Sequence, residues 1–442
     1  MERTLQPSVP TMTALTPGSP TRAYRHYVLA ILVVVYTMNF VDRQILAILG
    51  PSVIKEFTLT DSQFGLMYGT AFALLYTTLA LPIAWFADRS SRRNIMSVAV
   101  LVWSAFTALC GVTHSFTQIF LARVGVGVGE AGGVAPAYSF IADYFPKSQR
   151  ARALSVYSLG IPLGSAFGIL FGGLIAHALS WRWAFVLVGG VGVLVAPIFR
   201  LTVRDPKRGG YETSAVLADA PAAVTATPPS LLEVFRIVSK KSSFWLLSFG
   251  AAASSVCGYG VAGWLPSFFK RSLHLGDVDR AWYYAGITLI GGCLGVLGGG
   301  ILADRAGKAS KRAYPIIPAL AFLVSLPCFF LAMNTSSLVV AFPLFLIPTG
   351  LNLMWLGPII TAVQHLVPAH MRTTASAMFL LINNLLGIAV GLWYFGFISD
   401  KLKPHFGDES LRYALYTGLG FYLVSSALFL LASRKLTKHW VE

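Results

Sequence analysis

Apolar runs long enough to cross a lipid bilayer occupy most of this chain, and they constrain its fold more than any other feature. A transmembrane helix needs about 20 mostly apolar residues. Twelve runs satisfy this requirement, separated by polar segments that are short except for residues 201–242. They comprise residues 25–50, 62–87, 93–113, 116–141, 149–177, 182–200, 243–269, 281–303, 313–333, 337–364, 373–399 and 412–433. A helix makes its backbone hydrogen bonds within one segment, so the sequence predicts an all-α membrane protein with twelve transmembrane helices.

The composition excludes several classes of protein. The chain is 55% hydrophobic and 12% charged, whereas a soluble domain is about 25% charged. Its net charge of +16 lies in short loops rather than on one face, which argues against nucleic acid as a partner. The eight histidines show no metal-ligand spacing, and there is no phosphate-binding loop. We therefore expect neither an enzyme nor a cofactor, apart from protons as a coupling ion.

The distribution of lysine and arginine predicts the orientation. With the N-terminus inside the cell, the inside segments hold 24 of the 34 basic residues and the outside loops hold 8. This bias places both termini in the cytoplasm of a multi-pass inner-membrane protein. Residues 1–24 lack an apolar core and are expected to be a disordered tail. The other predicted parts are helix bundles at 25–200 and 243–434, a cytoplasmic linker at 201–242 and a tail at 435–442.

Two loop sequences occur twice, once in each half. Residues 84–93 after the second run match residues 300–308 after the eighth, at an offset of 216. Residues 145–150 after the fourth run match residues 367–372 after the tenth, at an offset of 222. A repeat of about half the chain length, in the same topological positions, is typical of a duplicated transporter. It predicts two pseudo-symmetric six-helix bundles.

The repeated loops resemble the major facilitator superfamily over the full chain. Its motif after the second and eighth helices has glycine, aspartate, arginine, glycine and a basic residue at fixed spacing. The second copy fits this pattern, whereas the first has Ala84 and Ser91 in place of the glycines. The resemblance implies an alternating-access carrier whose motif residues latch the cytoplasmic mouth. These gating residues are Asp88, Arg89, Arg92, Asp304 and Arg305.

Two membrane helices show a finer resemblance. The first run contains Asn39, Asp42 and Arg43 in an Asn-x-x-Asp-Arg pattern, and the fourth begins a glycine-rich pattern at Arg123 that ends in Glu130 and an alanine. These patterns are similar to the Spinster branch, which moves lysophospholipids and sphingoid phosphates. The resemblance implies a single-chain lipid phosphate as substrate.

Four charged side chains lie at membrane depth, namely those of Asp42, Arg43, Arg123 and Glu130. Inserting each into the bilayer costs about 2.5–3.5 kcal/mol even on the mildest scale. Arg123 and Glu130 are seven residues apart and therefore share one helix face. Depths counted from the helix ends place Asp42 level with Arg123 and put Glu130 nearer the midplane. We predict that Asp42, Glu130 and Arg123 carry proton coupling, with Arg43 as a further charge partner. A static ion-pair cluster is the alternative.

The predicted substrate contacts come from both halves, with charge in the first and with aromatic and amide groups in the second. They are Asn39, Arg43, Glu130, Tyr259, Trp264, Asn352, Trp355 and Asn383. Each aromatic residue has packing or lipid contact as its alternative role. A channel would need a visible selectivity filter, and none is found. We therefore expect a monomeric, proton-coupled secondary transporter of a lysophospholipid or similar amphiphile, with a carrier of small organic anions or drugs as the alternative.

Overall fold

The computed structural model describes residues 21–87, 89–205, 231–368 and 371–441. Most of the predicted N-terminal tail and linker lies outside these ranges. So does Asp88, one of the predicted gating residues, and the side chain of Asp304 is likewise outside the described part.

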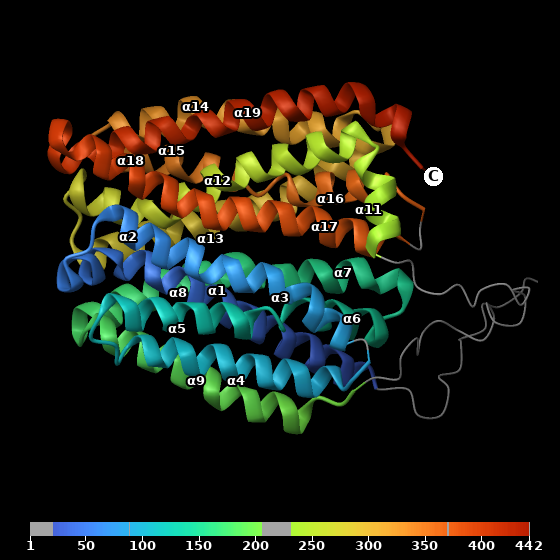
Figure 1. The fold of residues 1–442 in the computed structure, drawn as a ribbon, viewed down its shortest axis with the longest axis horizontal. Helices are drawn as coiled ribbons and strands as arrows, with labels where there is room; N and C mark the ends of the chain where they lie inside the picture. Colours follow the sequence, from blue (N-terminus) through green and yellow to red (C-terminus); the bar gives the residue numbers. More distant parts are fainter. Residues whose placement is uncertain (1–20, 88, 206–230, 369–370, 442) are drawn as a thin grey trace, which may run out of the picture.

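Helices make up nearly all of the described chain (Figure 1). Those of the first half are α1 (Arg22–Phe57), α2 (Asp61–Gly65), η1 (Leu66–Thr70), α3 (Ala71–Ala87), α4 (Arg92–Cys110), α5 (Phe116–Glu130), α6 (Val134–Tyr144), α7 (Lys147–Ser158), α8 (Gly160–Ala178) and α9 (Trp181–Thr202). Those of the second half are α11 (Leu231–Ser239), α12 (Ser242–Arg271), α13 (Asp277–Ala309), α14 (Ala313–Asn334), α15 (Leu338–Leu351), α16 (Leu356–Gln364), α17 (Arg372–Asn384), η3 (Leu385–Val390), α18 (Gly391–Phe406), η4 (Gly407–Glu409) and α19 (Ser410–His439).

These helices cross the membrane twelve times within the described residues. Eleven continuous helical stretches are long and apolar enough to span a bilayer, and the last of them covers 66 residues from Thr374 to His439. That stretch contains two crossings, because the chain turns at Gly407, where φ is +54°, and α19 packs back along α18. The predicted runs fall on these helices within a few residues. The largest differences are at two helix ends. The helix α1 continues past Pro51 to Phe57 and ends at Thr58 in a left-handed conformation, and α18 continues past the predicted end at residue 399 to Phe406.

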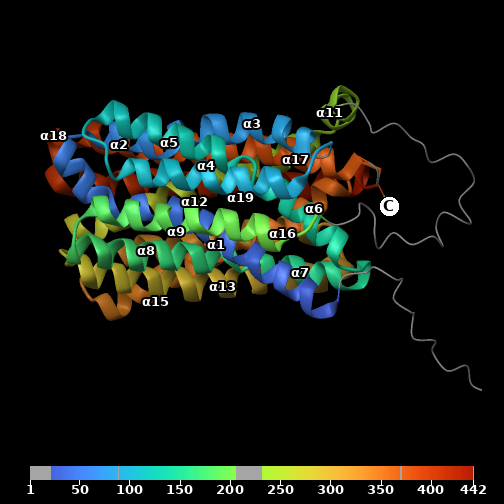
Figure 2. The ribbon, with the colours of Figure 1, turned by 90° about the horizontal axis from the view of Figure 1, so that it is seen from below.

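The crossings form two six-helix bundles, drawn in blue to green and in yellow-green to red in Figure 1. The main contacts between the bundles are those of α8 with α13, of α2 with α18, of α1 with α12, and of the segments η1 and η3 with each other. Figure 2 shows α8 and α13 side by side along the seam between the bundles. The predicted two-bundle architecture is therefore present in the structure.

The second and eleventh crossings each contain a π-helical segment, and these two segments touch. Thr70 in η1 donates its hydroxyl to the carbonyl of Ala389 in η3 at 3.0 Å. The backbones approach so closely that a Cβ atom on Gly69 would lie 2.6 Å from the carbonyl oxygen of Ile388. Short π segments within α-helices are frequent at functional sites, and here they form the contact between the halves beside the central pocket.

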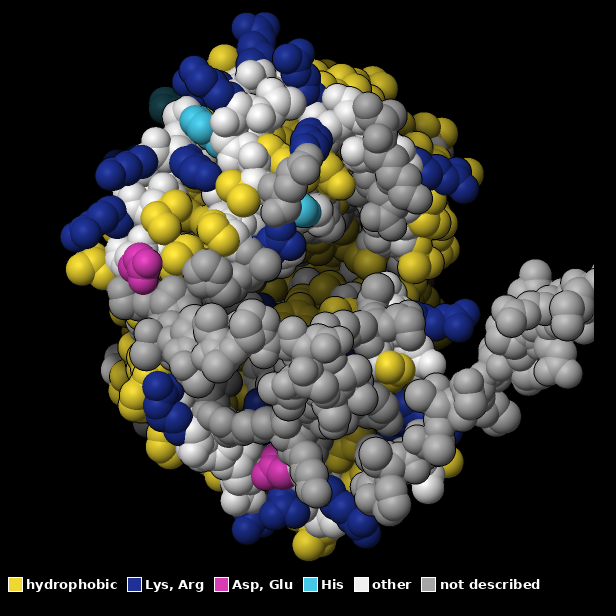
Figure 3. Space-filling view, turned by 90° about the vertical axis from the view of Figure 1, so that its right-hand side faces the viewer, with side chains coloured by type: hydrophobic (Ala, Val, Ile, Leu, Met, Phe, Trp, Pro, Cys, Tyr) yellow, Lys and Arg dark blue, Asp and Glu magenta, His cyan; other side chains and the backbone are white. Residues whose placement is uncertain are grey.

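The two ends of the molecule differ. The start of α1, the end of α9, the start of α11 and the end of α19 lie at one end, which we call the linker end (Figure 1). Viewed from that end, the molecule is hollowed at its centre, and hydrophobic side chains show inside the hollow (Figure 3). The halves meet at the opposite end, which we call the closed end and which carries Asp61 and Arg271. The cavity therefore opens toward the linker end.

Candidate functional site

An ion pair between α1 and α5 lies at the centre of the first bundle. The Nε of Arg43 donates to the Oε2 of Glu130 at 2.8 Å. The Glu130 side chain is fully buried, whereas the Arg43 side chain is 12% exposed. The amide of Asn39, one turn before Arg43, lies next to the same carboxyl group. Glu130 is thus paired with Arg43, and of these two side chains only Arg43 is partly exposed.

Asp42 and Arg123 form a second, looser contact behind this pair. Both side chains are buried, and Arg123 donates from a terminal nitrogen to the backbone carbonyl of Asp42 at 3.4 Å. Neither carboxyl oxygen of Asp42 has a hydrogen-bond partner, although Trp103 and Thr107 of α4 lie close to it. The predicted common level of Asp42 and Arg123 agrees with this contact, which runs through the backbone carbonyl of Asp42. Depth arithmetic places residues at one level but does not fix which face each presents.

Glycines in α5 bring these charges to the centre. A Cβ atom on Gly127 would lie 2.4 Å from the carbonyl oxygen of Phe72 in α3, and one on Gly129 would lie 2.4 Å from the backbone nitrogen of Trp103 in α4. The helices can approach this closely only where side chains are absent. The glycine-rich run of α5 therefore acts as a thin packing surface. Glu130 is the last residue of α5, directly before the break that leads to α6.

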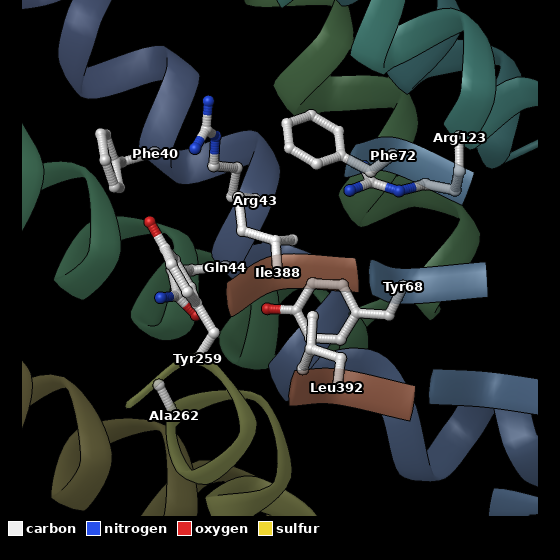
Figure 4. Close-up of a pocket in the computed structure, with 10 residues that line it drawn as sticks. All are labelled: Phe40, Arg43, Gln44, Tyr68, Phe72, Arg123, Tyr259, Ala262, Ile388 and Leu392. Atoms are coloured by element: carbon white, nitrogen blue, oxygen red, sulfur yellow. The ribbon is translucent and has the colours of Figure 1, made fainter. Parts of the chain in front are cut away.

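Aromatic rings surround the Arg43 guanidinium. Its Cζ lies 5.1 Å from the ring centre of Phe40, 4.8 Å from that of Phe72 and 4.6 Å from that of Tyr76. Phe72 also contacts the Arg123 guanidinium, at 5.6 Å, so this ring lies between the two arginines (Figure 4). Cation–π contacts of this kind stabilise a cation that has left bulk water. These three rings belong to the first half, whereas the predicted aromatic contacts lie in the second.

A small chamber of about 30 Å³ lies among these residues. Its lining comprises Phe40, Arg43, Gln44, Tyr68, Phe72, Arg123, Tyr259, Ala262, Ile388 and Leu392 (Figure 4). A drug-sized ligand needs roughly 300–1,000 Å³. The chamber can therefore hold only part of such a ligand.

Tyr259 is the predicted second-half contact that reaches this chamber. Of the other four, Trp264, Trp355 and Asn383 are buried and Asn352 is partly buried. Trp264 donates its indole N–H to the carbonyl of Leu392 at 2.9 Å, and Asn352 accepts from the Tyr422 hydroxyl at 3.0 Å. Asn383 accepts from the Ser255 hydroxyl at 2.8 Å, and Trp355 packs edge-on against Phe379. The side chains of Trp264, Asn352 and Asn383 thus have hydrogen-bond partners inside the second bundle, and none of the four lines the chamber.

An inter-bundle clasp closes the other end of the molecule. Both terminal nitrogens of Arg271 in α12 donate to the two carboxyl oxygens of Asp61, at 2.7 and 2.6 Å. Ser399 of α18 donates to the same carboxylate at 2.7 Å. Asp400 in turn accepts the backbone N–H groups of Asp61 and Ser62 at 3.0 and 2.7 Å. An acidic side chain at the amino end of a helix also meets the favourable end of its dipole.

Sequence reasoning missed this clasp. Asp61 follows Thr60, and Thr60 forms a capping box with Gln63, so the pattern predicts only the start of a helix. Asp400 and Arg271 lie near the ends of their runs, where charges are ordinary. The available signal was that acidic and basic residues face each other at the outer ends of the second, seventh and eleventh runs.

The predicted gating residues lie at the linker end. Arg92 makes an ion pair with Asp143 of α6, and Arg89 lies over the Trp85 ring at 3.9 Å. Arg305 is exposed near the end of α13. Arg92 therefore contacts its own bundle in this conformation, in which the linker end is open.

A duplicated bundle of transmembrane helices around a charged central site, closed at one end and hollowed at the other, defines a membrane transporter. The sequence model of the Major Facilitator Superfamily matches residues 32–392. The chain belongs to this superfamily and, within it, to the transporters of the Spinster type. Like these relatives, it is a transporter and not an enzyme.

The similar proteins cover nearly the full chain. An MFS-type efflux pump of Mycolicibacterium smegmatis is 32% identical over 96% of this chain and 95% of its own length. The Protein spinster homolog 1 of Xenopus laevis is 30% identical over 93% of this chain and 83% of its own length. A crystal structure of a bacterial homolog of the human lysosomal transporter Spinster, inward-facing and unoccupied, superposes with a TM-score of 0.85 at 30% identity, covering 96% of this chain and all of that one.

Proposed function

We propose that this protein uses a proton gradient to move a single-chain lipid with a phosphate head group, such as a lysophospholipid, across the membrane. The observation that carries this proposal is Arg43, a partly exposed guanidinium inside a ring of aromatic side chains at the bottom of the cavity. Similarity to the Spinster type supports the class of substrate.

Both parts of such a lipid find suitable surroundings. Guanidinium groups bind phosphate through short, charge-assisted hydrogen bonds. The acyl chain would lie in the hollow of Figure 3, where hydrophobic side chains show between the bundles. Burial of each CH₂ group contributes about 0.8 kcal/mol, so the lipid gains affinity from its chain as well as from its head. The 30 Å³ chamber would take part of the head group only.

Proton coupling would follow because the substrate phosphate and the Glu130 carboxylate compete for Arg43. A phosphate on Arg43 displaces Glu130 from its ion pair, and the carboxylate is then left in a buried place without its partner. A buried charge without a partner is costly, so the binding of a proton to Glu130 accompanies the binding of substrate. Asp42, whose carboxyl oxygens lack hydrogen-bond partners, and Arg123 beside it would form a second protonation site.

We assign the linker end to the cytoplasm of the inner membrane, because 24 of the 34 basic residues precede, follow or connect helices at that end. Both termini are then cytoplasmic, and the conformation is inward-facing. In the outward-facing state, the motif residues Asp88, Arg89, Arg92, Asp304 and Arg305 would hold the cytoplasmic mouth closed. Asp88→Asn should therefore favour the inward-facing state, and cysteine probes that keep wild-type accessibility at both faces would contradict this. We expect the monomer to be the transporting unit.

A carrier of small organic anions or drugs is the second candidate, favoured by the 32% identity to an efflux pump. In this reading Arg43 binds a carboxylate, and the aromatic rings contact a compact ligand.

One titration distinguishes the two candidates. Purified protein is titrated with lysophospholipids of increasing chain length and with short-chain carboxylates, and Arg43→Gln serves as the control for occupation of the site. Affinity that rises with chain length and falls in the control supports the lipid. Binding of the short carboxylates, with indifference to chain length, would replace it by the second candidate. Proton-dependent, saturable flux in liposomes tests the coupling.

A further inference from the structure

A groove on the outer face of the first bundle lies apart from the central site. It has a volume of about 490 Å³ and runs between α3 and α4 down to the end of α5. Its walls are apolar, and Phe86 and Val98 on its two sides are each 55% exposed. Its floor is formed by Val128, Gly129 and Gly132, at and just after the end of α5.

The end of the groove nearest the linker is polar. Ser90, Ser91 and Asn94 line it there, at the turn between α3 and α4. Arg200 of α9 donates to the Asn94 side chain at 2.8 Å, and its guanidinium is otherwise exposed. The groove thus has one apolar end at membrane depth and one polar end at the membrane surface.

Positive charge predominates among the described side chains at this mouth. Arg200 is joined by Arg89, which is exposed and directly precedes the lining residue Ser90, with its Cζ 3.9 Å from the centre of the Trp85 ring. The described acidic side chain at the mouth is Asp205, and its carboxylate already accepts from the Ser91 hydroxyl and from the backbone N–H of Arg93. Basic pockets between transmembrane helices on the cytoplasmic side are suited to anionic lipid head groups.

We propose that this groove binds an anionic phospholipid of the leaflet at the linker end, with one acyl chain between α3 and α4 and the phosphate head group beside Arg200 and Arg89. The occupant is a bilayer lipid because the groove faces away from the central hollow and its apolar walls are open to the side. The site is distinct from the transport site. It shares a wall with it, since Gly129 and Gly132 flank Glu130 in the chain.

The test measures lipid retention by native mass spectrometry on protein taken from nanodiscs of mixed phosphatidylglycerol and phosphatidylcholine. Val98→Trp narrows the groove, and Leu101→Trp, at a 44% exposed position of the same helix outside the groove, is its control. Arg200→Gln removes the head-group charge. Its control is Arg434→Gln, an exposed arginine at the same end of the other bundle.

Wild type and both controls should retain one phosphatidylglycerol in preference to phosphatidylcholine. Val98→Trp should lose that lipid, and Arg200→Gln should reduce the preference about fivefold, as expected for one basic residue near the membrane surface. The proposal is overturned if wild type shows no preference, or if Val98→Trp and Arg200→Gln retain phosphatidylglycerol as their controls do. Thermal unfolding in detergent confirms that each variant is folded.

Discussion

Asp61 of the first bundle and Arg271 of the second form a bidentate ion pair, with N–O distances of 2.7 and 2.6 Å. Asp61 is 2% exposed and the Arg271 side chain 20% exposed. This pair cannot persist when the closed end opens, because α2 and α12 belong to different bundles. It therefore contributes to the stability of one conformation and not of the other.

Asp61→Asn should shift the conformational equilibrium toward the state in which the closed end is open. Breaking a buried pair costs about 3–5 kcal/mol, and the partial exposure of Arg271 lowers this to about 2 kcal/mol, which corresponds to roughly 30-fold in population. Cysteine accessibility at the closed end measures the shift.

The matched control for this change is Glu56→Gln. Glu56 pairs with Arg182 at 2.5 Å within the first bundle, so its loss weakens an ion pair of the same end without separating the bundles. Equal accessibility in the two variants would show that the clasp between the bundles does not hold the closed end.

Glu130→Gln should abolish transport driven by a pH gradient while leaving exchange of bound substrate partly intact. The amide cannot take up a proton, yet it keeps the shape of the side chain beside Arg43. Flux into liposomes with and without an imposed gradient separates the two activities. A variant that responds to the gradient as wild type does would place coupling elsewhere, and Asp42→Asn is then the next variant to measure.

Arg43→Lys should weaken substrate binding although the charge is kept. Lysine lacks the planar fork that pairs with phosphate in two-pronged fashion and stacks less well on aromatic rings. Loss of one charge-assisted hydrogen bond and of the contacts with Phe40, Phe72 and Tyr76 predicts a decrease in affinity of about 10- to 100-fold. Tryptophan fluorescence or calorimetric titration measures it. An unchanged dissociation constant would mean that a point charge suffices and that the rings serve packing alone.

The sequence predicted the fold well because its signals are local. Apolar run length, the positive-inside bias and the repeated loops each depend on neighbouring residues, and together they specify twelve crossings in two bundles. The buried charges were found because a charge at membrane depth is conspicuous in any sequence. The partner of each charge was not predicted. Whether Glu130 pairs with Arg43 or with Arg123 depends on how α1 and α5 are rotated about their axes. That rotation is set by contacts such as that of Gly127 with Phe72.

The second-half contacts were predicted less well for a related reason. Aromatic and amide side chains are equally common in helix packing and at ligand sites, and composition does not distinguish the two. Trp264 and Asn383 have buried hydrogen-bond partners that lie 128 residues away in sequence. Such long-range partners become visible only when the helices are placed in space.

Gly65→Ala should favour the same conformation as Asp61→Asn by a different route. A Cβ atom at this position would lie 2.4 Å from the carbonyl oxygen of Leu392 and 2.9 Å from the Cα of Trp393, and the obstructing atoms are backbone, which cannot rotate aside. The closed end must therefore separate. Alanine is favoured over glycine within a helix by about 1 kcal/mol, so the first bundle itself should fold at least as well as in wild type.

Gly190→Ala is the control for this prediction, since no atom lies within 4 Å of a Cβ placed there on α9. We expect Gly65→Ala to increase cysteine accessibility at the closed end and to slow transport, whereas Gly190→Ala leaves both unchanged. When Gly65→Ala is combined with Asp61→Asn, it should add little further accessibility, because both changes open the same contact between α2 and the second bundle. If Gly65→Ala transports at the wild-type rate with an inaccessible closed end, the approach of α2 to α18 is not required for closure.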